Sequence, residues 1–526
     1  MKRGLVFLLV AAMFTAFAWQ SQLASFGDDS ASYLTLAHYF SPWGDPAVSR
    51  WAGWHSNFPP LFPLALALSG APSNLAIGFA LVALFAAGGV FLFQRYAAAE
   101  LGERGAFAVT IVFLCTATAW ISLKGLLSES LFLLVSMAAL RFYQSRLFAR
   151  EANTYEWLAF GVLLACAPLT RAIGILLVVA FALHLVIRFA KRDRPPRAAW
   201  LALLPTVVLL GLWYAVRPRA PIDFYQFAVS WVVNSWLENP LVTALGAWRM
   251  FFDSWIGLFL ADSEVAFGAK VVLAAIGVVA ATGVVMRVMR NRFDGWFALL
   301  SVGVIFVWTF GPQTTRRLMY PLLPLLLLFA ADAVRQLLDA LRLVERRRLY
   351  AAAAITAMPI LLCLPALVAI GEKSLDRRAA IAGCPQTFRE ITPYYNTVNL
   401  EGAEGLARLE VIMLCGLQSL DKVTPPGSVV MWTRPEYVAL LAKRPAVPYY
   451  YRWTPRELAT AIKSGNADYL VITILNKNDL EGGLPKPTKG MQEEAYSQPV
   501  FASTDEILVV KKIDKAALER FLEGTR

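Results

Sequence analysis

Long apolar stretches alternate with short polar gaps from residue 5 to residue 370, and they do not recur beyond that point. An apolar helix of about 20 residues crosses the roughly 30 Å hydrocarbon layer of a membrane. The pattern predicts a mostly α fold, with a polytopic membrane helix bundle in residues 1–370 and a separate domain in residues 371–526. About eleven spans are expected, at 5–24, 73–93, 106–123, 127–145, 157–171, 173–190, 199–216, 266–286, 295–311, 320–336 and 350–370.

The basic residues indicate which ends of these spans face the cytoplasm. Lys and Arg gather in alternate gaps, including 2–3, 188–197, 287–292 and 335–348, and the intervening gaps contain fewer of them. Cytoplasmic loops of membrane proteins carry this excess. We therefore expect a multi-pass plasma (inner) membrane protein whose N-terminus is cytoplasmic. An odd number of spans then places the C-terminal domain outside the cytoplasm.

Two of the external loops are long, at 25–72 and 217–265, and both are rich in Trp, Phe, Tyr and Pro. This composition is typical of short helices that lie in the membrane interface. The first apolar stretch also fits a cleaved signal peptide that ends near Ala24. We favour an uncleaved span, because the residues that follow it carry the candidate chemistry.

The pattern after residue 370 is that of a small α/β domain. Apolar runs of strand length stand at 429–432, 469–474 and 507–511, and helical patterns at 436–442, 456–463 and 515–523. Cys384 and Cys415 fall in this extracytoplasmic domain, where a disulfide is chemically allowed. Two free buried thiols are the alternative interpretation.

The composition excludes two broad classes of protein. Of the 526 residues, 58% are hydrophobic and only 16% are charged, which is too few charges to solvate a globular protein of this size. The net charge of +12 would suit nucleic acid, but its placement in alternate gaps reflects membrane orientation instead. No nucleic-acid partner is expected.

The densest polar cluster lies just beyond the first span. Asp28 and Asp29 precede Tyr33, and in a helix Asp29 and Tyr33 lie four residues apart on one face. One interpretation is a helix N-cap at a membrane exit, where the helix dipole stabilises carboxylates. The other is a reactive site.

Further ionisable residues are predicted on the same external side of the membrane. Glu129 lies at the turn between two spans, Arg171 at another turn, and Arg316 and Arg317 precede Tyr320. Charges at membrane depth are energetically expensive and usually face the protein interior or an aqueous cavity. Each alone is more often structural. Together, carboxylates and arginines suit a reaction that needs a general base and a phosphate-binding group.

These residues stand in an order that resembles the GT-C superfamily of polytopic glycosyltransferases, in particular its aminoarabinose transferase and protein O-mannosyltransferase branch. The resemblance covers about residues 1–370 and is carried by five segments: Asp29 to Tyr33, Asn57 to Leu64, Leu127 to Glu129, Leu169 to Arg171, and Arg317 to Pro324. The family often has Asp-Glu where this chain has Asp28-Asp29, so either carboxylate is a candidate base. The spacing to Tyr33 favours Asp29.

The resemblance implies transfer of a hexosyl or pentosyl group from a polyprenyl-phosphate donor to a lipid, glycan or protein acceptor at the extracytoplasmic face. Asp29, or its neighbour Asp28, would take the acceptor's proton, and Glu129 would bind the acceptor, orient the base or hold an ion. The leaving phosphate would be neutralised by Arg317 or Arg316, together with Arg171. Arg317 is favoured because it lies three residues before Tyr320, one helical turn away on the same face. The implied substrate-binding residues are Tyr33, His55, Arg171, Arg316, Arg317 and Tyr320. No metal site and no cofactor is expected, and the chain has no Gly-rich phosphate loop.

A membrane transporter or flippase of lipid-linked or small polar substrates is the alternative, because it also needs charges inside the membrane. It predicts internal symmetry and charges near mid-membrane, whereas the charges here are expected at external turns and no repeat is found. A catalytically inactive scaffold is a third interpretation.

Overall fold

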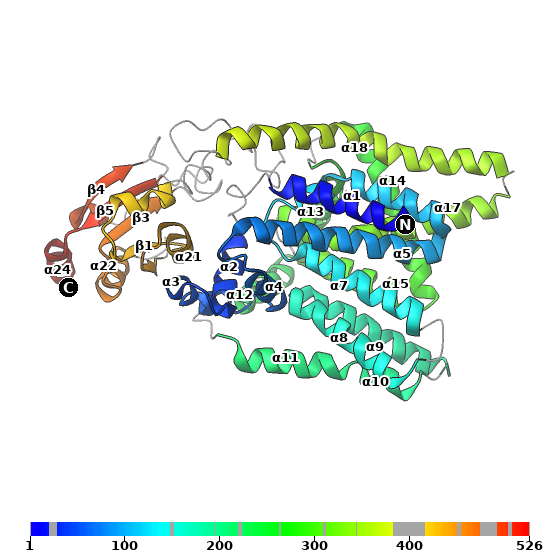
Figure 1. The fold of residues 1–526 in the computed structure, drawn as a ribbon, viewed down its shortest axis with the longest axis horizontal. Coiled ribbons are helices and arrows are strands. Elements are labelled where there is room, and N and C mark those ends of the chain that lie inside the picture. The colour runs from blue at the N-terminus through cyan, green and yellow to red at the C-terminus, as the bar shows by residue number, and fades with distance from the viewer. Residues whose placement is uncertain are drawn as a thin grey trace.

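In a computed structural model the chain is mostly helical, with one small sheet. The structure describes residues 2–19, 29–147, 152–193, 195–218, 224–261, 265–308, 312–342, 345–381, 416–449, 454–473, 492–502 and 508–524. Long helices lie side by side in a bundle, and the sheet lies beyond one end of it (Figure 1). Asp28, Cys384 and Cys415 lie outside the described residues.

The bundle is built on α5, which packs against α1, α7, α17 and α18, while α14 packs against α17 and α15 against α9. Its helices are α1 (Lys2–Trp19), α5 (Leu75–Cys115), α7 (Glu129–Phe142), α8 (Thr154–Thr170), α9 (Ile175–Ala190), α10 (Arg197–Leu201), α11 (Leu204–Val216), α14 (Phe267–Met289), α15 (Phe293–Val307), α17 (Leu323–Ala340) and α18 (Glu345–Ile381). Among the described residues, six helices are long and apolar enough to cross a membrane, and three shorter apolar helices accompany them. The polytopic bundle is thus confirmed, whereas the number of eleven spans stays a prediction.

Gly102 divides α5 into two helices that fold back on each other. Its φ of 75° and ψ of 170° are far from helical values and are open to glycine almost alone. The rings of Phe93 and Phe113, twenty residues apart in sequence, consequently lie 6.5 Å apart. The predicted separate spans at 73–93 and 106–123 correspond to these two halves.

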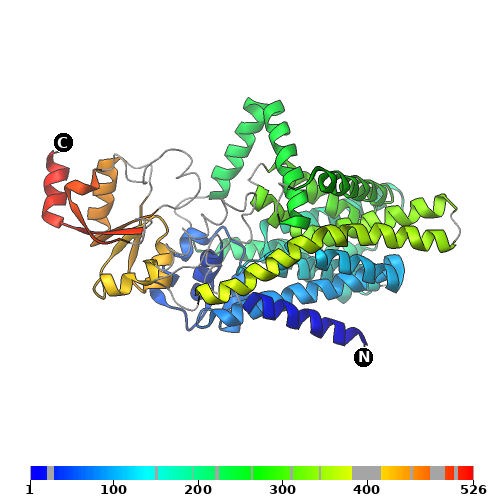
Figure 2. The ribbon, with the colours of Figure 1, turned by 90° about the horizontal axis from the view of Figure 1, so that it is seen from above.

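The two long loops fold differently from each other. The first forms short helices, as expected: α2 (Ser30–Phe40), α3 (Pro46–Ser49), the 3-10 turn η1 (Ala52–His55) and α4 (Leu61–Ser69). The second forms α12 (Phe224–Glu238) and α13 (Pro240–Leu260), of 15 and 21 residues, so the prediction of short helices is wrong there. Only Asn239-Pro240 interrupts the helical pattern, and Pro240 is well tolerated at the first position of α13. Figure 2 shows this pair standing out from the bundle.

The five-stranded sheet has the order β2-β1-β3-β5-β4. β1 (Val430–Trp432) pairs in parallel with β2 (Ala446–Pro448) and with β3 (Tyr469–Thr473), while β5 (Leu508–Ile513) is antiparallel to β3 and to β4 (Ser497–Ala502). The register joins Met431 to Val447 and Val471 to Val510. Helices α22 (Pro455–Ser464) and α24 (Lys515–Gly524) pack against each other beside it.

The sequence pattern predicted the three inner strands, which correspond to β1, β3 and β5, and missed both edge strands. β2 ends in Pro448 and β4 contains Pro499 beside a bulge. Proline has no N–H to donate, and it is tolerated in edge strands because one side of such a strand needs no hydrogen bonds. Edge strands that contain proline therefore do not look like strands in the sequence. The helix predicted at 436–442 is a short α21 (Pro435–Tyr437) continued by a π turn, Val438–Ala442.

Candidate active site

Asp29 stands at the N-cap position of α2, but its side chain does not cap the helix. The carboxylate instead accepts a hydrogen bond from Nη2 of Arg317, with 2.6 Å between Nη2 and Oδ2. The Asp29 side chain is 34% exposed. The structure therefore disfavours the N-cap interpretation of this residue.

Arg317 holds a second carboxylate at the same time. Its Nε donates to Oε1 of Glu129 over 2.7 Å, and Nη1 of Arg171 lies 2.9 Å from the same oxygen. The side chains of Glu129, Arg171 and Arg317 are 2%, 13% and 18% exposed. We call Asp29, Glu129, Arg171 and Arg317 the carboxylate–arginine cluster.

Helix ends bring the four side chains of this cluster together. Glu129 opens α7, where the positive end of the helix dipole favours an anion. Arg171 follows the last residue of α8, and Arg317 lies in the last turn of α16 (Pro312–Met319). Polar residues at helix ends can meet without placing charge in the apolar middle of the bundle.

Tyr33 ties α2 to the same place. Its hydroxyl lies 2.7 Å from Oγ of Ser128, which also accepts a hydrogen bond from Nη1 of Arg171 at 3.1 Å. The Tyr33 ring packs edge-on against Phe58 and Phe62, with ring centroids 5.1 and 4.9 Å apart. Phe58 and Phe62 stand on either side of Pro59-Pro60, inside the segment from Asn57 to Leu64, and they hold the tyrosine beside the cluster.

Arg316 and Tyr320 point elsewhere. Nη1 of Arg316 donates to the backbone oxygen of Ala261 over 2.7 Å, and its side chain runs so close to Gly257 that a methyl group there would collide with it. Tyr320 is buried and stacks on Phe113, with centroids 6.1 Å apart. Neither is joined to the cluster's carboxylates by a hydrogen bond that we observe among the described residues.

His55 is buried in the loop of residues 25–72 and lies near charges from two parts of the chain. The pKa of its imidazole is lowered to about 4, mainly by burial and also by the Arg434 guanidinium, while Asp29 opposes both effects. Arg434 immediately precedes α21, which contacts α2. The buried Glu436 of α21 has its pKa raised, mainly by burial. The sheet-bearing part of the chain therefore lies against the residues that surround the cluster.

Several buried polar atoms around α2 and η1 lack a hydrogen-bond partner among the described residues. Buried polar groups are nearly always paired, so such a group of atoms is typical of a site that takes a polar ligand. The atoms are Oγ of Ser30, Nε2 of His55, Oγ of Ser56, Nδ2 of Asn57 and Oε2 of Glu129.

The two carboxylates of the cluster differ in their suitability as a proton acceptor. Glu129 is buried and shared by two arginines, so it is held as an anion that orients them. Asp29 has one arginine partner and is partly open to solvent. A proton acceptor must be reachable by the group that it deprotonates, and Asp29 meets that condition.

Ser128, Arg434 and Glu436 were not among the candidates from the sequence. Ser128 had a signal, since it lies in the polar run Ser128-Glu129-Ser130 inside an apolar region. Arg434 and Glu436 had none, because nothing in the sequence shows that residues some four hundred positions later return to α2.

Comparison with solved structures shows the same fold in other proteins. The chain aligns with ArnT from Cupriavidus metallidurans bound to undecaprenyl phosphate at a TM-score of 0.55, with 16% identity, covering 98% of both chains. The apo state of ArnT aligns at 0.53 with 14% identity and the same coverage. The Archaeoglobus fulgidus oligosaccharyltransferase in complex with Zn and sulfate aligns at 0.52 with 12% identity, covering 95% of this chain and 72% of that chain.

No protein-family profile matches the chain, and no curated protein matches its sequence. The likeness is thus one of structure.

Proposed function

We propose that this chain, whose fold is that of the GT-C glycosyltransferases as its motifs predicted, is a membrane glycosyltransferase that uses a polyprenyl-phosphate sugar. The observation that carries the proposal is the position of Arg317 between Asp29 and Glu129. An arginine that can bind phosphate stands directly beside a carboxylate that can take a proton. ArnT was solved with undecaprenyl phosphate, and we propose a donor of the same lipid class here.

Arg317 would exchange partners when the donor binds. Its planar guanidinium suits two phosphate oxygens, and the donor phosphate competes with Asp29 for Nη2. Glu129 would keep its bond to Nε, because it is the more deeply buried partner. Donor binding would then release the Asp29 carboxylate at the moment when a base is needed.

The transfer would be a single displacement. The acceptor's nucleophilic oxygen or nitrogen forms a bond to the anomeric carbon of the sugar as the bond from that carbon to the phosphate oxygen breaks. The acceptor's proton passes to Asp29, and the bonding electrons leave with the lipid phosphate. Arg317 stabilises the charge that grows on the leaving oxygen.

The other site residues would support these two. Arg171, held by Glu129 and Ser128, adds positive charge for the phosphate. Tyr33 and His55 line the side of the cluster formed by the external loop, where we place the acceptor or the sugar. Arg316 and Tyr320, which face the bundle interior, are assigned to positioning α16 rather than to direct substrate contact.

The surrounding architecture belongs to the same proposal. We place the cluster at the extracytoplasmic face of a plasma (inner) membrane, with about eleven spans in a domain of residues 1–370. Residues 371–526 would form the extracytoplasmic α/β domain. The acceptor is a lipid, glycan or protein.

Mass spectrometry of envelope glycans, glycolipids and glycoproteins tests the proposal in the native cell. A strain that lacks the chain is complemented with the wild type, with Asp29→Asn or with Arg316→Lys, which keeps the charge at a position outside the cluster. We expect one sugar-bearing species to vanish in the deletion strain and to return with the wild type and Arg316→Lys only. Full restoration by Asp29→Asn at equal protein level would contradict it.

A further inference from the structure

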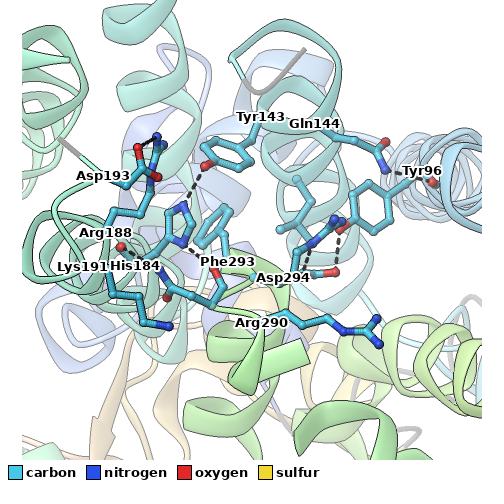
Figure 3. A pocket seen from close by; sticks show the side chains of 13 residues that line it. Tyr96, Tyr143, Gln144, His184, Arg188, Lys191, Asp193, Arg290, Phe293 and Asp294 are labelled. Atoms are coloured by element: carbon cyan, nitrogen blue, oxygen red, sulfur yellow. Dashed lines mark hydrogen bonds and ion pairs between the residues drawn. The ribbon is translucent and has the colours of Figure 1, made fainter. Parts of the chain in front are cut away.

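A second polar site lies at the other end of the helix bundle. It is a cavity of about 270 Å³ between the ends of α7, α9 and α14 and the start of α15. Aromatic and basic side chains line it together, among them Tyr143, Arg188, Lys191 and Arg290 (Figure 3). Arg292 also belongs to the lining. Its size lies just below the usual range for sites of small ligands.

This cavity is separate from the carboxylate–arginine cluster. Glu129 opens α7 and Tyr143 follows its last residue, 14 residues later. A helix rises 1.5 Å per residue, which places the two about 21 Å apart along the axis. That distance is most of the hydrocarbon thickness of a membrane. The cavity therefore opens at the opposite face, which the basic gaps predict to be cytoplasmic.

The floor of the cavity is held in place by hydrogen bonds. Nδ1 of His184 lies 2.7 Å from the backbone oxygen of Asn291, and its Nε2 lies 2.7 Å from the Tyr143 hydroxyl. A carbonyl only accepts, so Nδ1 donates, and in the neutral imidazole Nε2 accepts from Tyr143. Figure 3 shows His184 between these groups, with the Tyr96–Asp294 bond farther along the wall.

The charges in the lining do not balance. Both carboxylates of the lining are engaged: Asp193 with Arg188 over 2.8 Å, and Asp294 with Arg287, also over 2.8 Å. A second arginine of the lining, Arg292, pairs with the carboxylate of Glu100.

Two cations of the lining have no carboxylate partner among the residues that the structure describes. These are Arg290, whose side chain donates to the neutral amide of Gln336 at 2.7 Å, and Lys191. Both side chains are exposed at the rim. The cavity therefore presents two uncompensated positive charges.

Exposed apolar side chains stand at the ends of the two helices that these cations follow. Phe189 lies two residues before Lys191 and Met289 one residue before Arg290, and they are 61% and 74% exposed. In a membrane these surfaces face acyl chains. A pocket that combines basic residues with adjoining apolar surface at the cytoplasmic end of a helix bundle suits the headgroup of an anionic lipid.

We propose that this cavity binds the headgroup phosphate of an anionic phospholipid. Lys191 and Arg290 contact the phosphate from the rim, and the acyl chains lie against Val186 and Phe189 of α9 and against Val285 and Met289 of α14. The proposal does not depend on the transferase activity, because the two sites lie at opposite ends of the bundle.

Native mass spectrometry of the purified full chain in neutral detergent tests it. Dioleoyl phosphatidylglycerol is titrated against the wild type, against Lys191→Gln with Arg290→Gln, and against the matched control Arg104→Gln with Arg342→Gln. The control removes two exposed arginines that stand in other basic gaps and do not line the cavity. Each cation near an anionic lipid contributes about fivefold, so the cavity variant should bind on the order of 25-fold more weakly.

Four results decide the matter. Tight retention of one phosphatidylglycerol by the wild type and by the control, with loss in the cavity variant, supports the proposal. Equal losses in both double variants would mean that only the overall surface charge attracts the lipid. Equal binding of dioleoyl phosphatidylcholine, or displacement of the lipid by inorganic phosphate at matching concentration, would also overturn it, because the site would then not select an anionic lipid.

Discussion

Replacing each carboxylate of the carboxylate–arginine cluster by its amide should separate structural support from catalysis. Oε1 of Glu129 lies 2.7 Å from Nε of Arg317 and 2.9 Å from Nη1 of Arg171, and 2% of the Glu129 side chain is exposed. Glu129→Gln leaves two largely buried guanidinium groups without their shared anion. Breaking a buried pair from one side typically destabilises by about 3–5 kcal/mol, and we expect the free energy of unfolding to fall by that amount.

Asp29→Asn is the matched substitution at the partly exposed end of the same cluster. Asp29 meets one arginine, and 34% of its side chain is exposed. An exposed ion pair contributes about 1 kcal/mol or less, so stability should change little. Turnover should nevertheless fall by about 10² to 10⁴, the usual contribution of a general base.

The assay is unfolding of the detergent-solubilised protein in a denaturant titration, followed by tryptophan fluorescence. Wild type and both amide variants are compared at one lipid and detergent concentration. Sugar transfer by Asp29→Asn is then measured in membranes that contain equal amounts of protein. Equal losses of stability in the two variants would refute the reasoning that burial distinguishes these carboxylates.

Three further predictions follow from other parts of the chain. His55 has a pKa of about 4 in the folded protein and about 6.5 in the unfolded chain. The unfolded chain therefore binds more protons between these two pH values, and stability is lost as pH falls from about 6.5 towards 4, by about 3 kcal/mol in all. His55→Gln should flatten the pH dependence of the unfolding free energy across that window, and an unchanged slope would exclude His55 as the cause. Gly102→Ala should destabilise by about 1–3 kcal/mol. The cause is the backbone conformation alone, because no other atom lies within 4 Å of the place that the new methyl group would take. Gly211→Ala, inside α11 and with equal space for a methyl group, should stabilise by up to about 1 kcal/mol in the same denaturant titration, so equal effects at both positions would contradict this account. Reporter fusions after Arg348 should be cytoplasmic and fusions after Arg378 extracytoplasmic, since an apolar stretch separates the two points; a cytoplasmic reading at both would exclude the span between them.

Periodicity and charge predicted the parts of the fold that depend on one segment at a time. Apolar length identified the bundle helices, and even the two halves of α5 were separated, because Gly102 lies in a polar gap. The inner strands of the sheet were visible as short apolar runs. β2 and β4 were not, since they are short, contain proline and depend on a neighbouring strand for their definition.

In the candidate site, too, features of single segments could be predicted and features of tertiary packing could not. Span order predicted that Asp29, Glu129, Arg171 and Arg317 lie at the same end of the bundle, and the structure joins the four by ion pairs. Of the two adjacent arginines, the spacing to Tyr320 favoured Arg317, and Arg317 is the one that pairs with both carboxylates. Neighbours on a helix point about 100° apart, so the choice depends on the rotation of α16, which is set by packing against α13. The position of Arg434 near His55 likewise depends on tertiary packing and could not be predicted from the sequence.

Binding of undecaprenyl phosphate tests the central claim most directly, because it requires no knowledge of the sugar or the acceptor. The purified chain is titrated with this lipid and with undecaprenol, which lacks the phosphate, and the titration is repeated with Arg317→Ala, Arg317→Lys and Arg316→Ala. We expect the wild type to prefer the phosphate and Arg317→Ala to lose about 2–5 kcal/mol of binding free energy. Arg317→Lys should recover part of the loss, and Arg316→Ala should bind nearly as the wild type does. Equal affinity for the two lipids, or unchanged phosphate binding in Arg317→Ala, would contradict the account.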